Sequence, residues 1–355
     1  MLFRLVLFAA FLALAPQARA QDCAPEGGMG FICGAQRPED LVRIPETRWI
    51  VASGFQDGAG LKLVDTQAKT MSFWFVDAKA QSKANRRAYP HCPGPLSVET
   101  FNAQGLSLRP RGAGYMLYVA NHGGRESIEV FNVDLAGEAP PKLTWIGCVL
   151  MPDGYPANSV VSFADGELLA SNLLRPGATI ADYTEKRVTG GVYSWKPGQE
   201  RFRLLPGTEL PGNNGIERSL DEKSFYIVSF GLKQVLEFSR ADTRKPLRVA
   251  DAPGIMPDNI RWDSGKLIVA GLMADEPACG GLRKVVNGVA DPMICHRGYV
   301  AAALDPETFT FSILAYGEPN ARFNGTSTAI IVGKEMWFGS WQADRIAWRM
   351  LPGEN

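Results

Sequence analysis

The sequence predicts an all-β protein, a six-bladed β-propeller with four-stranded antiparallel blades around a central channel. A short phrase recurs along the chain: a polar residue, a short β-prone run, a tight turn and a second β-prone run. The 37 glycines and 24 prolines are scattered and divide the 355-residue chain into short pieces. Sustained helical periodicity is hard to find. These observations together indicate many short strands arranged in a repeated unit.

The recurring phrase indicates how many blades to expect. It is clearest over residues 158–172, 213–230 and 258–271, and weaker copies are found elsewhere. The six copies begin at residues 39, 104, 158, 214, 258 and 327. Their spacing is uneven but comparable with blade lengths of roughly 40 to 50 residues plus loops. Further strand-like runs lie between the copies, such as residues 127–133 and 234–238. About four strands per repeat is the content of one propeller blade.

The first twenty residues have the features of a secretory signal peptide. Arg4 supplies a positive charge, residues 5–15 are apolar, and Ala18-Arg19-Ala20 has a small-x-small cleavage pattern. We expect residues 1–20 to be removed and residues 21–355 to form one propeller domain, in a bacterial periplasm or outside the cell. An uncleaved membrane anchor is the alternative, but the apolar run is short for a bilayer span. No second spanning segment follows residue 20 in the sequence.

Cysteine usage and charge narrow the classes of function. All six cysteines lie beyond the signal, and in an oxidising compartment disulfides are favoured over metal binding. The pairs Cys23–Cys33, Cys92–Cys148 and Cys279–Cys295 are our hypothesis among the many connectivities that six cysteines permit. Acidic and basic residues balance at 37 each without a basic block, which argues against nucleic-acid binding. Residues 273–297 interrupt the blade spacing and are interpreted as an insertion able to cap the channel mouth.

The residues that head the six phrases predict a metal site. The first strand of each propeller blade lines the central channel, so these positions are expected to converge. All six are polar and carry a side-chain oxygen: Glu39, Gln104, Asn158, Asn214, Asp258 and Ser327. Carboxylate and amide oxygens without soft ligands suit a hard cation, and an irregular site favours calcium over magnesium. The alternative is ordinary turn chemistry, because Asn-Gly and Asp-Asn are common turn formers.

Residues 39–341 resemble the calcium-dependent six-bladed propeller hydrolases: paraoxonases (arylesterases), gluconolactonase-type enzymes and the strictosidine-synthase-like group. The motifs that carry the resemblance are Pro38-Glu39-Asp40, the strand that ends in Asn121-His122, Ile128-Glu129-Val130-Phe131, Asn214-Gly215-Ile216 and Asp258-Asn259-Ile260. The family has a catalytic calcium. By position, the resemblance implies that its ligands here are Glu39, Asn158, Asn214, Asp258 and Asn259.

Two positions depart from the paraoxonase pattern. Paraoxonases carry a histidine where this chain has Gln104, and that histidine is thought to activate water with help from the one matched by His122. A glutamine is not a general base, so paraoxonase activity itself is not implied. Paraoxonases also bind a second, structural calcium through an aspartate that is Ser159 here. Asp40 is therefore expected to lack a carboxylate partner.

The sequence favours a secreted calcium-dependent hydrolase of lactones or esters, in which water attacks a metal-polarised carbonyl. The catalytic candidates are Asp258, as base or direct nucleophile, together with His122 and Gln104. A sugar-lactone or phosphotriester hydrolase is one alternative. A strictosidine-synthase-like protein without hydrolase activity and a non-enzymatic periplasmic binding propeller are two more. The expected ligand is a small lactone or ester.

Overall fold

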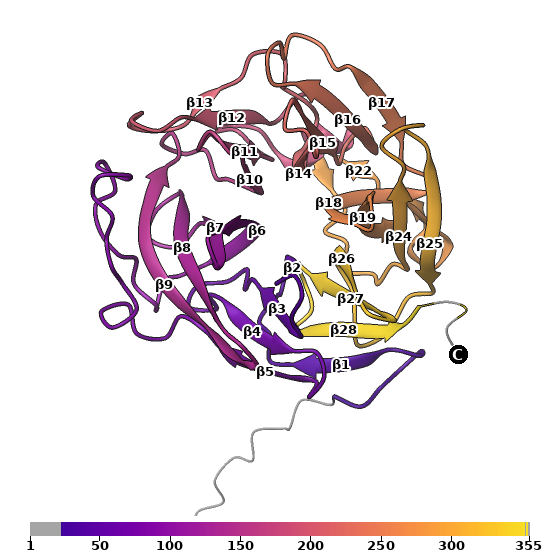
Figure 1. Ribbon diagram of the computed structural model, residues 1–355. Coiled ribbons are helices and arrows are strands. Elements are labelled where there is room, and N and C mark those ends of the chain that lie inside the picture. Colours follow the sequence, from indigo (N-terminus) through magenta and orange to yellow (C-terminus); the bar gives the residue numbers. More distant parts are fainter. Residues whose placement is uncertain (1–22, 352, 354–355) are drawn as a thin grey trace, which may run out of the picture.

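The computed structural model describes residues 23–351 and 353 of the chain. Within these residues, six four-stranded antiparallel sheets stand around a common axis, each with one strand at the centre and one at the rim (Figure 1). The predicted all-β, six-bladed propeller is therefore confirmed. The predicted signal peptide, residues 1–20, lies outside the described residues. No helix in the described part of the chain is long and apolar enough to cross a membrane.

The strands of each blade are given from the inner strand to the outer one. The first three blades are β2 (Leu41–Arg43), β3 (Trp49–Ala52), β4 (Lys62–Asp65) and β5 (Thr70–Phe73); β6 (Ala103–Arg111), β7 (Gly114–Asn121), β8 (Ser127–Ala136) and β9 (Ala139–Leu150); and β10 (Val160–Ser162), β11 (Leu168–Asn172), β12 (Gly191–Trp195) and β13 (Arg203–Leu204). The last three are β14 (Asn213–Arg218), β15 (Ser224–Ser229), β16 (Gln234–Ser239) and β17 (Arg248–Asp251); β18 (Ile255–Asp263), β19 (Lys266–Met273), β24 (Tyr299–Leu304) and β25 (Phe311–Gly317); and β26 (Thr326–Val332), β27 (Glu335–Ser340), β28 (Arg345–Met350) and β1 (Gly30–Cys33).

The hydrophobic core lies between neighbouring blades. The middle strands are covered on both faces, so they are apolar in continuous runs rather than in alternation. Strand β15 is an example, because all of its residues are buried. Phe225 pairs across the sheet with Phe238, and their rings stack with centroids 5.7 Å apart. Val161 and Leu169 of the preceding blade belong to the same cluster.

The ring is closed by strands from the two ends of the chain. Strand β1 pairs antiparallel with β28, so the last blade combines the first strand of the fold with the last three (Figure 1). Gly30 lies opposite Trp348, and a Cβ atom on this glycine would overlap the indole ring. A glycine is required here because the tryptophan side chain lies across its backbone. The Cys23–Cys33 disulfide ties the segment before β1 to its last residue.

We expect Gly30→Ala to destabilise the protein by about 1–3 kcal/mol, the usual cost of overpacking a filled site. Denaturant unfolding of the purified protein measures this change. In a Trp348→Ala background the same substitution is expected to cost much less, because the clashing ring is gone. An equal cost in both backgrounds would contradict the role assigned to this contact.

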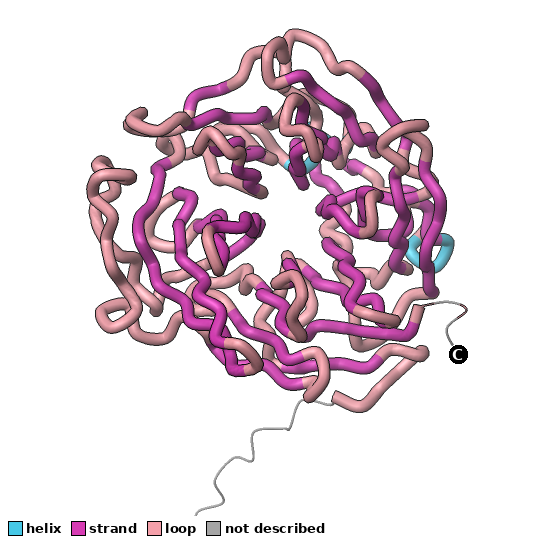
Figure 2. Tube along the Cα trace, viewed as in Figure 1, coloured by secondary structure: helices cyan, strands magenta, loops and turns pink. Residues whose placement is uncertain are grey.

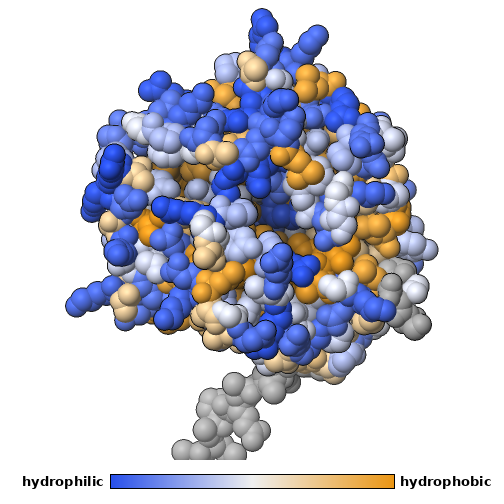
Figure 3. Space-filling view, viewed as in Figure 1, coloured by the Kyte–Doolittle hydropathy of each residue, from blue (hydrophilic) through white to orange (hydrophobic). Residues whose placement is uncertain are grey.

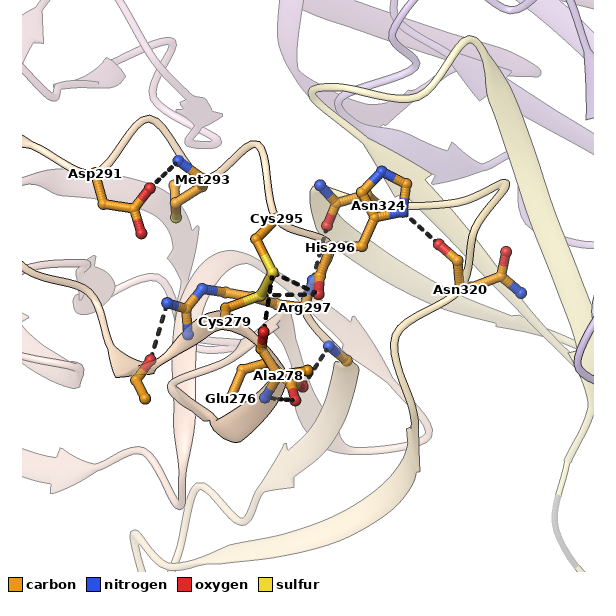
Figure 4. The surroundings of a disulfide bond; sticks show 12 residues. Glu276, Ala278, Cys279, Asp291, Met293, Cys295, His296, Arg297, Asn320 and Asn324 are labelled. Carbon is orange, nitrogen blue, oxygen red and sulfur yellow. Dashed lines mark hydrogen bonds between the residues drawn. A yellow bond between two sulfur atoms is a disulfide. The ribbon is translucent and has the colours of Figure 1, made fainter.

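All three predicted disulfides are present: Cys23–Cys33, Cys92–Cys148 and Cys279–Cys295. Cys92 lies in the long connection between β5 and β6, and its bond to Cys148 ties that connection to β9. The Cys279–Cys295 bond closes the segment that was interpreted as an insertion (Figure 4).

The insertion, residues 273–297, lies between the second and third strands of the fifth blade. Its elements are β20 (Asp275–Glu276), the 3-10 helix η1 (Pro277–Cys279), β21 (Gly281–Leu282), β22 (Val285–Val286) and β23 (Val289–Ala290). Its base is held by Arg297, which is buried and donates to the carbonyls of Ala274 at 3.1 Å and Gly281 at 3.0 Å. Figure 4 shows this arginine beside the disulfide.

Helical structure is confined to short pieces, as Figure 2 shows. Apart from η1, the described helix is α1 (Ile180–Thr184), between β11 and β12. It begins with a capping box, in which the Thr179 hydroxyl and the Asp182 carboxylate satisfy each other's backbone N–H groups. Helix α1 contacts β23, so the helix and the insertion pack against each other.

Candidate metal centre and adjoining cavity

The inner strands are irregular at the predicted metal residues. In four blades the pairing of the inner strand with its neighbour shifts register there, which is the mark of a β-bulge. The residues left outside the regular ladder are Gln104-Gly105, Asn214-Gly215, Asp258-Asn259 and Ser327. In the other two blades, Glu39-Asp40 and Asn158-Ser159 immediately precede the inner strand. A bulge changes the direction of a side chain, so these positions are freed from strand alternation.

Two glycines let neighbouring inner strands approach closely at this level. A Cβ atom on Gly215 would lie 2.7 Å from the Asn259 Cα atom and 2.7 Å from the Asp258 carbonyl oxygen. A Cβ atom on Gly105 would lie 2.5 Å from the Asn158 carbonyl oxygen. The Gln-Gly and Asn-Gly pairs therefore do more than form turns, because their glycines bring the polar residues of adjacent blades together.

The structure brings the predicted residues to one cavity of about 580 Å³. Among its lining residues are Glu39, Gln104, Asn158, Asn214 and Asp258. Asn259 joins them by donating from Nδ2 to Glu39 Oε1 at 2.8 Å. Ser327 contributes differently, because its Oγ donates to the Glu39 main-chain carbonyl at 2.5 Å. Ser327 therefore positions the backbone that carries Glu39.

Two buried carboxyl groups lie close enough to repel each other. Glu39 is 2% exposed and Asp258 is 6% exposed. Burial raises the pKa of Asp258 to about 8, against a hydrogen bond from Asn214 that lowers it. Burial also raises the pKa of Glu39 well above its ordinary range, and the charges of Asp258 and Asp40 add to that rise. A cation between the two carboxylates would relieve this repulsion.

Several oxygens of this cluster have no hydrogen-bond partner in the protein. Those buried without a partner are Glu39 Oε2, Asn158 Oδ1, Asn214 Oδ1 and Asn259 Oδ1. A buried acceptor without a partner costs about 1–3 kcal/mol, so four in one cluster need an explanation. Together with the Asp258 carboxylate they form an all-oxygen donor set of the kind that calcium takes. The residues present therefore fit one hard cation.

The candidate donor set contains more amide oxygens than carboxylate groups. No cluster of three or more His, Cys, Asp or Glu residues with metal-binding geometry occurs in the described residues. The candidate centre contains two carboxylates, Glu39 and Asp258, and draws its other oxygens from asparagines. Neutral amide oxygens and carboxylates together are normal ligands for calcium.

Asp40 takes no part in this centre. Its Oδ1 accepts from the Leu41 N–H at 2.9 Å, and its Oδ2 accepts from the Leu106 N–H at 2.7 Å. The guanidinium group of Arg261 also donates to Oδ2. Burial raises the pKa of Asp40, and Arg261 opposes that rise. The positive partner of Asp40 is Arg261, and a second buried carboxylate lies near both: burial and, to a smaller extent, the charge of Asp40 raise the pKa of Glu217, whereas Arg261 lowers it. A second cation does not fit at Asp40, because both of its oxygens are already engaged.

His122 does not line the cavity itself but contacts two residues that do, Gln104 and Phe55. Its Nε2 lies 2.5 Å from Gln104 Oε1, and its Nδ1 lies 2.8 Å from Glu126 Oε2. These two contacts hold the imidazole ring between Gln104 and Glu126, and the tautomer decides which nitrogen donates. Both ring nitrogens are engaged in these contacts, and the histidine holds the Gln104 side chain in place. This geometry assigns His122 a positioning role.

Most of the cavity wall lies outside the recurring phrase. The apolar lining residues are Phe55, Leu173, Ile180, Ala181, Phe230, Val289, Ala290, Pro292, Met293 and Trp341, with Tyr183 and Arg283 beside them. Several of these belong to the insertion or to helix α1. The insertion therefore lines the cavity. Hydrophilic residues cover most of the face in Figure 3, which is hollowed near the ring axis.

Comparison with solved structures places the fold among known propellers. A luciferin-regenerating enzyme superposes with a TM-score of 0.52 at 14% identity, covering 90% of this chain and 93% of the other. A gluconolactonase from Xanthomonas campestris, XC5397, superposes with a TM-score of 0.53 at 13% identity, covering 91% of this chain and 89% of the other. No protein-family model and no curated protein matches the sequence. Identity this low establishes the fold alone: the chain is a six-bladed propeller of the architecture that gluconolactonase-type propellers share.

Proposed function

We propose that the protein is a secreted calcium-dependent hydrolase of lactones or esters. The observation that carries the proposal is the set of four buried oxygens without protein partners at an apolar cavity. Two of these oxygens belong to Asn214 and Asn259, whose side chains also bond to the carboxylates of Asp258 and Glu39. The gluconolactonase-type neighbours agree in fold with a lactone-hydrolase role. The three disulfides fit folding in an oxidising compartment.

In this proposal, Glu39, Asn158, Asn214, Asp258 and Asn259 would hold the ion. A bound calcium ion would supply Lewis-acid polarisation of the substrate carbonyl and stabilise negative charge that develops on its oxygen. Ser327 holds the main chain of Glu39, and Asn259 holds its carboxylate.

Proton transfer is assigned to Asp258. Its carboxylate lines the cavity and is oriented by Asn214. In the hydrolytic reaction it accepts a proton from the attacking water. Gln104, held by His122, lines the same cavity and positions substrate or water through its amide. Direct attack by Asp258 on the substrate is the alternative, and transfer of label from H₂¹⁸O in a single turnover distinguishes the two routes.

The cavity wall favours apolar substrates over sugar lactones. Aromatic and aliphatic side chains dominate the lining, with few polar groups away from the candidate metal centre. A sugar lactone presents several hydroxyl groups, and burying them against such a wall leaves their hydrogen bonds unmade. Alkyl or aryl lactones and esters match this wall.

Calcium removal tests the proposal. We expect purified protein to hydrolyse members of a lactone and aryl-ester panel, to lose this activity in a calcium chelator and to regain it when calcium is restored. At calcium about a hundredfold above its Kd, linkage predicts about 2.7 kcal/mol of added stability. Calorimetric titration and thermal unfolding with and without calcium measure binding directly. Hydrolysis that persists in the chelator, or no effect of calcium on stability, would remove the proposal.

A further inference from the structure

A small side pocket of about 70 Å³ adjoins the main cavity and is rich in positive charge. It shares Tyr183, Phe230 and Arg283 with the main cavity and is also lined by Lys186 and Lys233. Lys186 and Lys233 come from different blades, after helix α1 and from the turn between β15 and β16. Arg283 comes from the insertion. Three separate segments thus each bring a cation to the side pocket next to the main cavity.

These cations have no carboxylate partners in the described residues, since no ion pair is formed by Lys186, Lys233 or Arg283. Burial lowers the pKa of Lys233, and the nearby charges of Lys186 and Arg297 lower it further. Asp275 opposes this shift but forms no ion pair with Lys233. Gathering like charges that form no ion pair is costly, and an acidic ligand would offset that cost.

Arg283 is held in a defined orientation. Its Nε donates to the Asp291 carbonyl at 2.9 Å, and its Nη1 donates to the Tyr183 hydroxyl at 3.1 Å. Tyr183 in turn packs edge-on against Phe230, with ring centroids 5.6 Å apart. A guanidinium fixed in this way keeps further N–H donors for a planar acceptor, and a carboxylate matches that geometry.

We propose that the substrate carries a carboxylate, which Arg283, Lys186 and Lys233 bind in the side pocket while its ester or lactone group lies at the candidate metal centre. The inference rests on the proposed hydrolase function and narrows its substrate class. The apolar lining of the main cavity accommodates a hydrocarbon body. The ligand class is therefore an ester or lactone with an apolar body and an acidic end, such as a half-ester of a dicarboxylic acid.

A matched pair of esters tests the proposal. Monomethyl adipate and dimethyl adipate have the same chain, and only the first carries a carboxylate. In calcium-loaded protein we expect the ratio of kcat/KM values to favour the monoester. Arg283→Gln is expected to lower this ratio about tenfold, the effect of losing one charge-assisted hydrogen bond. Lys233→Gln, which leaves the insertion untouched, is expected to lower it about threefold.

The matched control is Lys284→Gln, because Lys284 is exposed, adjoins Arg283 and lines neither pocket. It should retain the ratio of the unmodified protein. If neither ester nor any member of the lactone and aryl-ester panel is hydrolysed, the proposed function fails, and calorimetric binding of the two esters still tests the subsite. Tighter binding of the monoester that is lost in Arg283→Gln supports the inference. Equal kcat/KM values for the two esters would overturn the inference. A kcat/KM ratio unchanged in both Arg283→Gln and Lys233→Gln would also overturn it.

Discussion

Glu39→Gln is expected to lower calcium-dependent hydrolysis by about 100-fold or more, and to weaken calcium binding with it. The substitution keeps the size of the side chain and removes one of the two charges of the candidate centre. It also replaces an acceptor oxygen with an N–H donor. Since Glu39 Oε2 has no partner in the protein, the substitution removes no hydrogen bond at that oxygen and acts on the bound cation instead.

The same variant should fold at least as well as the unmodified protein in the absence of calcium. Burial and two neighbouring carboxylates raise the pKa of Glu39, so its negative charge destabilises the calcium-free folded protein. A neutral amide removes that charge. Thermal unfolding should therefore show a normal transition without calcium and little further stabilisation when calcium is added.

The control for Glu39→Gln is Glu46→Gln, because Glu46 is exposed and is not part of the cavity lining. It should keep both the activity and the response to calcium. Asp258→Ala should behave like Glu39→Gln in activity. Full calcium-dependent hydrolysis in Glu39→Gln and in Asp258→Ala would remove the assigned metal centre.

Lys62→Met is expected to stabilise the protein by about 2–4 kcal/mol at pH 7. Lys62 is fully buried in β4, and its ammonium nitrogen has no hydrogen-bond partner. The nearest compensation is the ring of Phe73, whose centroid is 5.4 Å from Nζ. Burial lowers the pKa of Lys62 to about 7 from 10.5. Methionine fills the same space with an unbranched apolar chain and carries no charge to bury.

The effect of Lys62 should depend on pH in a defined direction. Between about pH 7 and 10.5 the unfolded chain binds a proton at this lysine that the folded chain has released. Stability therefore rises with pH across this window, and the penalty is complete below it, where both states are protonated. Lys62→Met should flatten that rise.

Denaturant unfolding at pH 7 and pH 9.5 measures the difference between the two proteins. The advantage of Lys62→Met should shrink at the higher pH. Lys79→Met, at an exposed lysine, serves as control and should change stability by less than about 0.5 kcal/mol at either pH. A destabilised Lys62→Met protein, or an advantage that does not vary with pH, contradicts the assignment.

The recurring phrase was sufficient to predict the fold and to select the residues around the axis. The polar residue that begins each copy occupies the equivalent position at the start of an inner strand. At four of these positions the pairing with the neighbouring strand is interrupted by a β-bulge. The hypothesised pairing of each cysteine with the next one along the chain was correct, although the sequence alone permits other connectivities. The role of the central residues as calcium ligands stays a prediction.

Other parts of the site depend on contacts that no local pattern contains. The Asp40–Arg261 pair joins residues of two blades far apart in the chain. The bond from His122 to Gln104 assigns the histidine a role that its position after a strand does not indicate. The cavity wall comes from connections such as helix α1 and the insertion, whose conformations follow from packing against the finished ring.

The pairing of β1 with β28 has a consequence for folding during synthesis. Gly30 can pair with Trp348 only after the residues between them, 31–347, have been synthesised. Until then one edge of the last blade and one free strand remain exposed, and both are open to pairing with other chains. The ring therefore cannot close until β28 has been synthesised, because the sixth blade needs both β1 and β28. Loss of a few residues from either strand should leave an open, aggregation-prone arc instead of a slightly smaller ring.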